Sequence, residues 1–292
     1  MLQAIGNTTN ILFPTFGPLA EIASLQDTPN TVIPHLYSES ADAHRSVRRI
    51  MQSNPDVVII NTILGAHLVQ HVKKLHPHVH VLWCIHESEC DQLMHMRTSI
   101  TPEVFAIADA IIFASKKTQE VYEQFNTGNM HVIHYGLDIA SIQDYLSTVD
   151  RNALRMQYQL PTSAIVITLI GTICPRKGQR EFIEAGMKVL EHLPKQHDVH
   201  FVIAGKCSPA YEQYIENILS EATYQGMRDQ FHLLPEQKNP FGYFACSDIY
   251  VCNSFIESFP IVIIEAMAFG LPIAASNTYG VAEQITDKEN GL

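Results

Sequence analysis

The chain has 292 residues, a formal net charge of −11, 46% hydrophobic residues and 17% charged residues. This length predicts two domains or one large domain with a substantial core, and the acidic balance argues against bulk binding to nucleic acid. No apolar run reaches the roughly 18 residues of a membrane span, and the first ten residues lack signal-peptide features. The six cysteines form no CxxC pair, so we expect free thiols in a reducing compartment. Taken together, these features predict a globular cytoplasmic α/β protein.

Two series of short apolar runs alternate with amphipathic segments. In the first series the predicted strands are 31–33, 57–61, 79–84, 110–114 and 131–134, with helical patterns at 41–53, 65–75, 102–109 and 115–125. In the second series the predicted strands are 165–171, 199–204, 231–234, 249–252 and 272–275, with helical patterns at 178–193, 209–225 and 260–269. Strands that alternate with helices favour parallel sheets with right-handed crossovers.

A polar stretch separates the two series. We interpret residues 1–138 as one Rossmann-like domain, 139–162 as a linker and 163–292 as a second Rossmann-like domain. Ligands of open α/β sheets bind outside the carboxyl ends of the strands. Two such domains facing each other therefore predict a cleft for two substrates.

The segment "ESFPIVIIE" places Glu257 in a loop before a buried helix and Glu265 on that helix. Pro260 suits the first helical turn, and the free N–H groups of Ile261 and Val262 would form an anion site with the helix dipole. A phosphate there would leave Glu257 beside the group that the phosphate carries, and Glu265 could accept hydroxyl hydrogens from a ribose diol. The alternative is a loop charge and a solvated helix residue.

A second segment, "VITLIGTICPRKGQREFIEA", runs through a strand, a turn, two basic residues and a helix. Arg176 and Lys177 follow the first strand of the second series, and Gly178 opens the next helix. A cation at this position could neutralise a diphosphate leaving group as its charge develops. The alternative is an ordinary solvated basic loop.

These segments together resemble the retaining GT-B glycosyltransferases, in particular family 4, the glycosyl transferases group 1. The two glutamates of "ESFPIVIIE", with "AMAFGLPI" after them, are the most specific match. "GTICPRKGQ" is similar to the family's donor-phosphate loop, and "CSDIYVCNSFIES" to the strand before its glutamates. "HYGLD" and "VLWCIHES" are weaker matches.

The resemblance implies a GT-B fold, with an N-terminal acceptor-side domain and a C-terminal domain that binds a nucleotide sugar. It implies sugar transfer to a hydroxyl acceptor such as a glycan, lipid or other glycoconjugate, with retention of anomeric configuration. It also implies no cofactor and no metal ion, in keeping with the absence of a DxD motif. The implied catalytic residues are His86, Lys177 and Glu257. The implied donor-binding residues are Gly171, Thr172, Arg176, Lys177, Glu257, Ser258, Phe259, Ile261, Val262 and Glu265.

The sequence departs from the family pattern in three places. Thr172 stands where many members carry an arginine, and Ser258-Phe259-Pro260 replaces a Gly-Phe-Gly step. The glycine-rich loop of the first domain is not recognisable before "NILFP", and family members continue beyond Leu292. We therefore expect a partial chain, or a short homologue, that binds a nucleotide weakly and transfers sugar poorly.

Fifteen histidines add further candidates. His67 and His71 are four residues apart on a predicted helix and form a candidate metal pair, but no third ligand is evident. The alternative for them is a solvated helix face. If the protein works at a membrane, Lys73, Lys74 and these histidines would contact anionic headgroups. His86 ends an apolar strand, and its alternative role is a structural one.

Two other functions stay open at this stage. One is another GT-B enzyme, such as a sugar-nucleotide epimerase, which would need further acid–base residues facing the donor sugar. The other is a noncatalytic protein that binds nucleotide sugar or only contacts partners. A nicotinamide-dependent dehydrogenase is disfavoured, because no GxGxxG follows any predicted strand.

Overall fold

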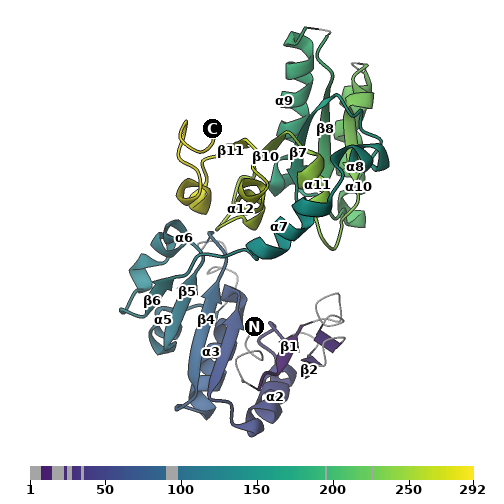
Figure 1. Cartoon of the computed structure of the whole chain (residues 1–292). Helices are drawn as coiled ribbons and strands as arrows, with labels where there is room; N and C mark the ends of the chain where they lie inside the picture. The colour runs from purple at the N-terminus through teal and green to yellow at the C-terminus, as the bar shows by residue number, and fades with distance from the viewer. Residues whose placement is uncertain are drawn as a thin grey trace. The chain divides into compact units, whose positions relative to one another are not determined.

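The computed structural model describes residues 8–14, 23–24, 28–33, 36–89, 98–194, 196–224 and 226–292. The chain divides into two compact units (Figure 1). Unit 1 comprises residues 1–113 and 118–133, and unit 2 comprises residues 114–117 and 134–292. Cys90 lies outside the described residues, and the other five cysteines are free.

A four-stranded parallel sheet in the order β3-β4-β5-β6 forms the centre of unit 1 (Figure 1). Its strands are β3 (Val57–Asn61), β4 (His80–Ile85), β5 (Ala110–Phe113) and β6 (Met130–Val132). The helices of this region are α2 (Ala41–Ile50), α3 (Ala66–Leu75), α5 (Pro102–Ile107) and α6 (Lys116–Val121). A separate parallel pair joins β1 (Ile11–Phe13) to β2 (Asn30–Val32). The fully buried Trp83 anchors the core, and its indole N–H donates a 2.9 Å hydrogen bond to the Thr62 carbonyl.

Unit 2 contains a five-stranded parallel sheet in the order β11-β10-β7-β8-β9, so β9 is an edge strand. Its strands are β7 (Ile165–Ile170), β8 (Val199–Ala204), β9 (Phe231–Leu234), β10 (Ile249–Cys252) and β11 (Ile273–Ala275). Its helices are α7 (Ile139–Thr148), α8 (Arg151–Gln157), α9 (Gln179–His192), α10 (Pro209–Tyr224), α11 (Phe241–Cys246) and α12 (Ile261–Ala268). No helix among the described residues is both long enough and apolar enough to span a membrane.

Alternate residues of β8 face opposite sides of this sheet, as the two-residue period of a strand requires. Phe201 and Ile203 pack in a core cluster with α9 and α10. Val202 and Ala204 pack in a second cluster with residues of α8 and α11. Both faces of β7 and β8 are therefore buried, which explains why these strands are continuously apolar.

The structure confirms the predicted α/β class with parallel sheets, and β3, β8, β9 and β10 match their predicted ranges. It adds β1 and α11, which the sequence analysis did not predict. Residues 139–162, expected to be a linker, contain α7 and α8 and belong to unit 2, which resumes at residue 134. Their polar character comes from capping and exposed faces: the Asp138 and Asp150 side chains accept hydrogen bonds from the first N–H groups of α7 and α8.

A buried arginine attaches α8 to the sheet of unit 2. The Arg155 side chain is only 4% exposed, and its Nη2 donates a 2.7 Å hydrogen bond to the Asp248 carboxylate. Its remaining N–H groups donate to the carbonyls of Cys246, Thr162 and Ala164 at 2.8 to 3.0 Å. The guanidinium therefore donates to four acceptors, of which Asp248 also accepts from Arg151 and from the Val166 N–H.

We expect Arg155→Met to destabilise unit 2 by about 3 kcal/mol, because it removes the buried partner of the Asp248 carboxylate and leaves three carbonyls without the arginine donor. Arg151→Met is the matched control, since Arg151 pairs with the same Asp248 but its side chain is 46% exposed. The control should cost less than about 1 kcal/mol. Urea unfolding of both variants measures the difference, and equal costs would contradict the structural role of Arg155.

Candidate functional site

The chain leaves β7 through a tight turn that carries the two predicted basic side chains. Gly171 follows β7 directly, and its N–H donates a 2.9 Å hydrogen bond to the Ala204 carbonyl at the end of β8. The buried Gln179, at the start of α9, donates from Nε2 to the Thr172 carbonyl at 3.0 Å. These bonds hold the turn at the carboxyl end of the sheet, where Pro175–Lys177 form a short 3₁₀ helix.

Gly178, between this 3₁₀ helix and α9, leaves no room for a side chain. Its φ of 72° lies in the left-handed region, and a Cβ there would lie 2.4 Å from the Asn253 carbonyl oxygen. The Asn253 side chain donates a 2.8 Å hydrogen bond from Nδ2 to the Gly178 carbonyl. Asn253 therefore fastens the turn after β7 to the loop after β10. Its Oδ1 is buried and accepts no hydrogen bond within the described part of the chain.

An ion pair between Lys177 and Glu257 lies at the centre of the site. The two side chains are only 18% and 12% exposed, so the pair is largely shielded from solvent. Arg176 lies 3.8 Å from the same carboxylate, and its Nη1 donates a 2.7 Å hydrogen bond to the Ile256 carbonyl. Two cations from one turn thus converge on one carboxylate from another loop.

The loop that follows Glu257 leads directly into α12. Pro260 occupies the N-cap position of this helix, and the N–H groups of Ile261 and Val262 belong to its first turn. The first N–H groups of a helix have no acceptor within it, and the helix dipole favours an anion beside them. Phe259 is buried just before the helix and stacks on His134 with ring centroids 4.7 Å apart.

A glycine on a neighbouring segment fixes the backbone of the same loop. The Gly280 N–H donates a 3.2 Å hydrogen bond to the Glu257 carbonyl. A Cβ at Gly280 would fall 1.6 Å from the Ser258 carbonyl oxygen, so only glycine fits there. The position of the Glu257 carboxylate is therefore fixed by close backbone packing as well as by its ion pair.

Glu265 lies on α12 and is half-buried. Burial raises the pKa of its carboxyl group above the ordinary value. It forms no hydrogen bond or ion pair with any residue that the structure describes. A half-buried carboxyl group without a partner is well suited to accept hydrogen bonds from hydroxyl groups of a ligand.

The hollow beside the ion pair is small in this structure. Its volume is about 10 Å³, on the order of one water molecule. Lys177, Asn253, Glu257 and Val262 are among the residues that line it. The Lys177–Glu257 pair therefore forms part of the wall of this hollow.

The structure thus brings together residues of two predicted segments, the turn after β7 and the loop before α12. Gly171 adjoins Lys177, since a Cβ on Gly171 would lie 3.6 Å from the Lys177 Cδ. Thr172 is exposed, and its carbonyl accepts the hydrogen bond from Gln179 that holds the turn. The sequence analysis missed Asn253 and Gln179. Gln179 follows the turn glycine Gly178 in the sequence, whereas Asn253 has no such signal, and the contacts of both depend on tertiary structure.

His86 follows β4 in unit 1 and is half-buried. Its backbone N–H donates a 3.1 Å hydrogen bond to the Glu87 carboxylate, which also accepts from the Ile63 N–H at 3.0 Å. Its ring Nε2 lies 3.4 Å from the Asn61 side-chain oxygen. The loop after β4 is therefore held in place by its own carboxylate, and the catalytic role of His86 stays a prediction.

The candidate metal pair packs α3 against α2. The His67 ring bonds the Leu36 carbonyl at 3.2 Å, and the His71 ring bonds the His44 carbonyl at 3.1 Å. The His44 and His71 rings stack with centroids 4.3 Å apart. No group of three or more His, Cys, Asp or Glu residues suited to a metal ion occurs in the described ranges. These contacts correspond to a structural role.

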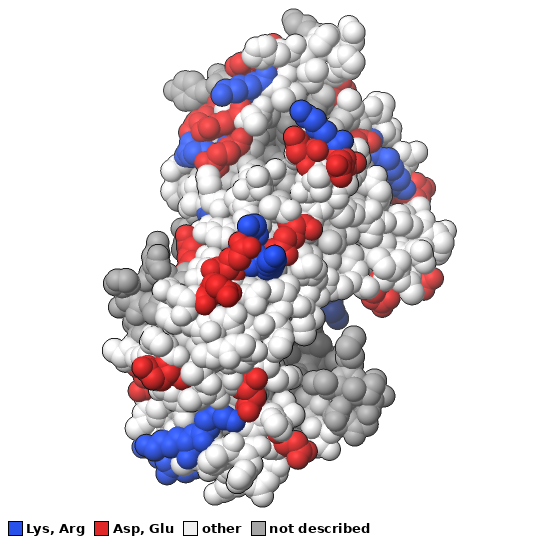
Figure 2. All heavy atoms as spheres, turned by 90° about the vertical axis from the view of Figure 1, so that its left-hand side faces the viewer, with Lys and Arg blue, Asp and Glu red and all other residues white. Residues whose placement is uncertain are grey.

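Lys73, expected to meet lipid headgroups, is engaged within unit 1. Its ammonium pairs with Asp109 at 2.8 Å and donates to the Val79 carbonyl at 3.2 Å. Figure 2 shows one face of the molecule, on which Lys and Arg side chains lie in small groups mixed with Asp and Glu. This face differs from the continuous basic stripe that is typical of nucleic-acid-binding proteins.

The part of the chain that contains the ion pair is similar to known proteins. Residues 150–292 match the family described as glycosyl transferases group 1. The chain is 26% identical over 199 residues to a D-inositol 3-phosphate glycosyltransferase of Xylanimonas cellulosilytica, covering 65% of this chain and 46% of that protein. It is 30% identical over 166 residues to the enzyme of the same name from Mycolicibacterium gilvum, covering 56% and 35%. The chain therefore spans less than half the length of these curated relatives.

Solved structures with the same fold cover the whole chain. The Anabaena protein HepE, in a crystal structure with UDP-glucose, has a TM-score of 0.79 and 19% identity, covering 100% of this chain and 79% of that one. A glycosyltransferase from Rickettsia africae has a TM-score of 0.82 and 17% identity, covering 100% and 76%. At these identities the similarity establishes the fold alone, which is the α/β fold of glycosyltransferases of the GT-B class.

We expect the stability of unit 1 to fall as the pH decreases below about 6.5, the usual range for histidine. Burial, and then the neighbouring His44, lower the pKa of His67 and of His71. The unfolded chain therefore binds protons that the folded unit excludes, so acid favours unfolding. Arg48 and Lys74 oppose protonation of His71, whereas Glu39 favours protonation of His67.

Thermal unfolding between pH 7 and pH 5 measures this effect. The His67→Gln/His71→Gln double variant should show a smaller loss of midpoint temperature than the unaltered chain. His131→Gln is the control, because His131 is an exposed residue of the same unit. An equally steep pH dependence in the double variant would contradict the assignment.

Proposed function

We propose that the chain, of which residues 150–292 match the family described as glycosyl transferases group 1, binds a nucleoside diphosphate sugar in unit 2 and transfers the sugar to a hydroxyl acceptor. The proposal includes retention of anomeric configuration and a reaction without a metal ion or cofactor. The observation that carries it is the Lys177–Glu257 ion pair, which lies between the turn after β7 and the start of α12.

Lys177 is suited to the diphosphate of the donor. When the bond from the sugar to the diphosphate breaks, negative charge grows on the leaving group, and a nearby cation lowers the energy of that state. Lys177 stands at the carboxyl end of the sheet, and the first N–H groups of α12 offer a second anion site. Arg176 supplies another cation beside the same carboxylate, in a turn where Thr172 replaces the usual arginine.

Glu257 and Glu265 are suited to the hydroxyl groups of the donor. The Glu257 carboxylate is held by Lys177 without a ligand, and it would exchange this partner for sugar hydroxyls when the diphosphate takes the lysine. Glu265 has an unoccupied, half-buried carboxyl group on the first turns of the same helix. In this proposal Glu257, in the loop before α12, contacts the sugar, and Glu265, on α12, contacts the ribose.

Similar proteins support the choice of donor. HepE is described in complexes with UDP and with UDP-glucose, and this chain shares its fold. The relatives named D-inositol 3-phosphate glycosyltransferase act on an acceptor that carries hydroxyl groups, and a hydroxyl acceptor is the proposal here. In unit 1 we propose His86 as a residue that contacts the reacting sugar.

We expect Glu257→Gln to lower the rate of sugar transfer at least about tenfold, or about 1.4 kcal/mol of transition-state stabilisation. The substitution keeps the size of the side chain and removes the charge that binds the sugar hydroxyls. The affinity for UDP alone should not fall, because Lys177 loses a competitor of the diphosphate. Transfer of radiolabelled sugar from UDP-glucose and from GDP- and ADP-sugars, with calorimetry of UDP binding, measures both effects.

Glu216→Gln is the control, since Glu216 is an exposed carboxylate on α10 of the same unit. The control should transfer sugar at the unaltered rate. A Glu257→Gln variant that matches the control in rate would remove Glu257 from the reaction. A variant that loses UDP affinity instead would assign Glu257 to the nucleotide rather than to the sugar.

A further inference from the structure

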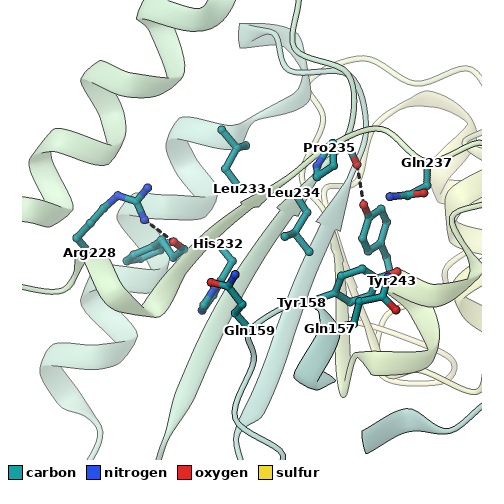
Figure 3. Close-up of a pocket in the computed structure, with 11 residues that line it drawn as sticks. Gln157, Tyr158, Gln159, Arg228, His232, Leu233, Leu234, Pro235, Gln237 and Tyr243 are labelled. Atoms are coloured by element: carbon teal, nitrogen blue, oxygen red, sulfur yellow. Dashed lines mark hydrogen bonds between the residues drawn. The ribbon is translucent and has the colours of Figure 1, made fainter. Parts of the chain in front are cut away.

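A second hollow lies along the edge strand of unit 2, away from the ion pair. Its volume is about 440 Å³, within the usual range of small-molecule sites. Figure 3 shows that its lining side chains come from β9, the end of α8, the start of α11 and the adjoining loops. This hollow, the β9 groove, is lined by Gln157, Tyr158, Gln159, Arg228, Phe231, His232, Leu233, Leu234, Pro235, Gln237 and Tyr243. It shares no lining residue with the hollow at Lys177 and Glu257.

The β9 groove offers uncharged hydrogen-bonding groups and aromatic surface. Three exposed amides contribute to it, those of Gln157, Gln159 and Gln237. The rings of Tyr158 and Tyr243 pack at 5.0 Å in its wall, and the Tyr243 hydroxyl donates a 2.7 Å hydrogen bond to a backbone carbonyl (Figure 3). No carboxylate lines the groove.

The lining contains a single cation. The Arg228 guanidinium donates one hydrogen bond, from Nη1 to the Phe231 carbonyl, drawn as a dashed line in Figure 3. A phosphate or carboxylate ligand would find no second basic residue in the lining. The groove therefore favours a ligand without charge.

A chain of hydrogen bonds fixes the histidine of the groove. The His200 Nε2 lies 3.0 Å from the Asp198 carboxylate, and the His200 Nδ1 lies 2.7 Å from the His232 Nε2. A carboxylate only accepts, so a neutral His200 donates from Nε2 to Asp198 and accepts at Nδ1. The His232 Nε2 must then carry the donated hydrogen, and the His232 Nδ1 is left as an acceptor.

His232 is held in this neutral state. Burial, then His200 and Arg228, lower its pKa to about 4, against a smaller opposite effect of Asp229. Its Nδ1 has no hydrogen-bond partner among the residues described. The groove thus presents a fixed, uncharged acceptor beside the Gln and Tyr side chains. A hydroxyl group is the donor that this acceptor suits.

We propose that the β9 groove binds a neutral carbohydrate, with a sugar hydroxyl donating to the His232 Nδ1 and the amides of Gln157, Gln159 and Gln237 bonding further hydroxyls. Amides both donate and accept, which matches the dual character of a hydroxyl. The half-buried Tyr158 ring offers an apolar surface for the C–H face of a sugar ring. This site goes beyond the proposed donor site and does not depend on it.

The test is NMR titration of the whole chain with neutral trisaccharides of gluco, manno and galacto configuration, in the presence of saturating UDP. UDP occupies the donor site, so a sugar that binds only there is excluded. We expect at least one trisaccharide to shift the backbone signals of β9 and of the end of α8. His232→Leu, which removes the acceptor, should weaken this binding at least about tenfold.

Gln159→Ala provides a second variant in case His232→Leu disturbs the fold, and it should weaken binding about threefold or more. Gln213→Ala is its matched control, an exposed glutamine on α10 that does not line the groove. The proposal is overturned if none of the three sugars binds, or if both groove variants bind them as well as the unaltered chain does. It is also overturned if UDP alone shifts the backbone signals of the β9 groove.

Discussion

The ion pair between Lys177 and Glu257 is the interaction on which the candidate site depends. It joins the turn after β7 to the loop before α12, and both side chains are largely buried. A buried charge without a partner is costly, so each residue restrains the position of the other in the absence of a ligand. Gly178 and Gly280 allow the close backbone approach that the pair needs. The site is therefore built before a ligand arrives, and a donor would exchange partners within it rather than order a loose loop.

Much of this arrangement is predictable because its signals are local. Largely apolar runs, each with one histidine, identified β8 and β9, and Pro260 with the apolar run after it identified α12. The two glutamates were recognisable because carboxylates are unusual in so apolar a segment. The contact of Glu257 with Lys177 was not predictable, because it joins residues that are distant in sequence and meet only when β10 pairs with β7.

Other features escaped prediction for physical reasons that can be named. Residues 139–162 are polar enough to suggest a linker, but Arg155 satisfies buried acceptors and makes α8 part of unit 2. Gln179 and Asn253 are ordinary polar residues in the sequence and become important through contacts across the turn. The β9 groove and its histidine chain depend on the pairing of β8 with β9, which places His200 beside His232. The two hollows of unit 2 also differ in kind, since one is built from charges and the other from neutral groups.

The most direct test of the central claim is to map the binding of UDP and of UDP-glucose on the backbone amide signals of the chain. We expect UDP to shift the signals of residues 171–178 and of Ile261 and Val262. UDP-glucose should shift these and also the signals of Glu257 and Ser258, because the sugar takes the carboxylate that Lys177 releases. If both ligands shift signals elsewhere but leave the signals of residues 171–178 and 257–262 unchanged, the account is contradicted. The nucleotide would then bind at another place.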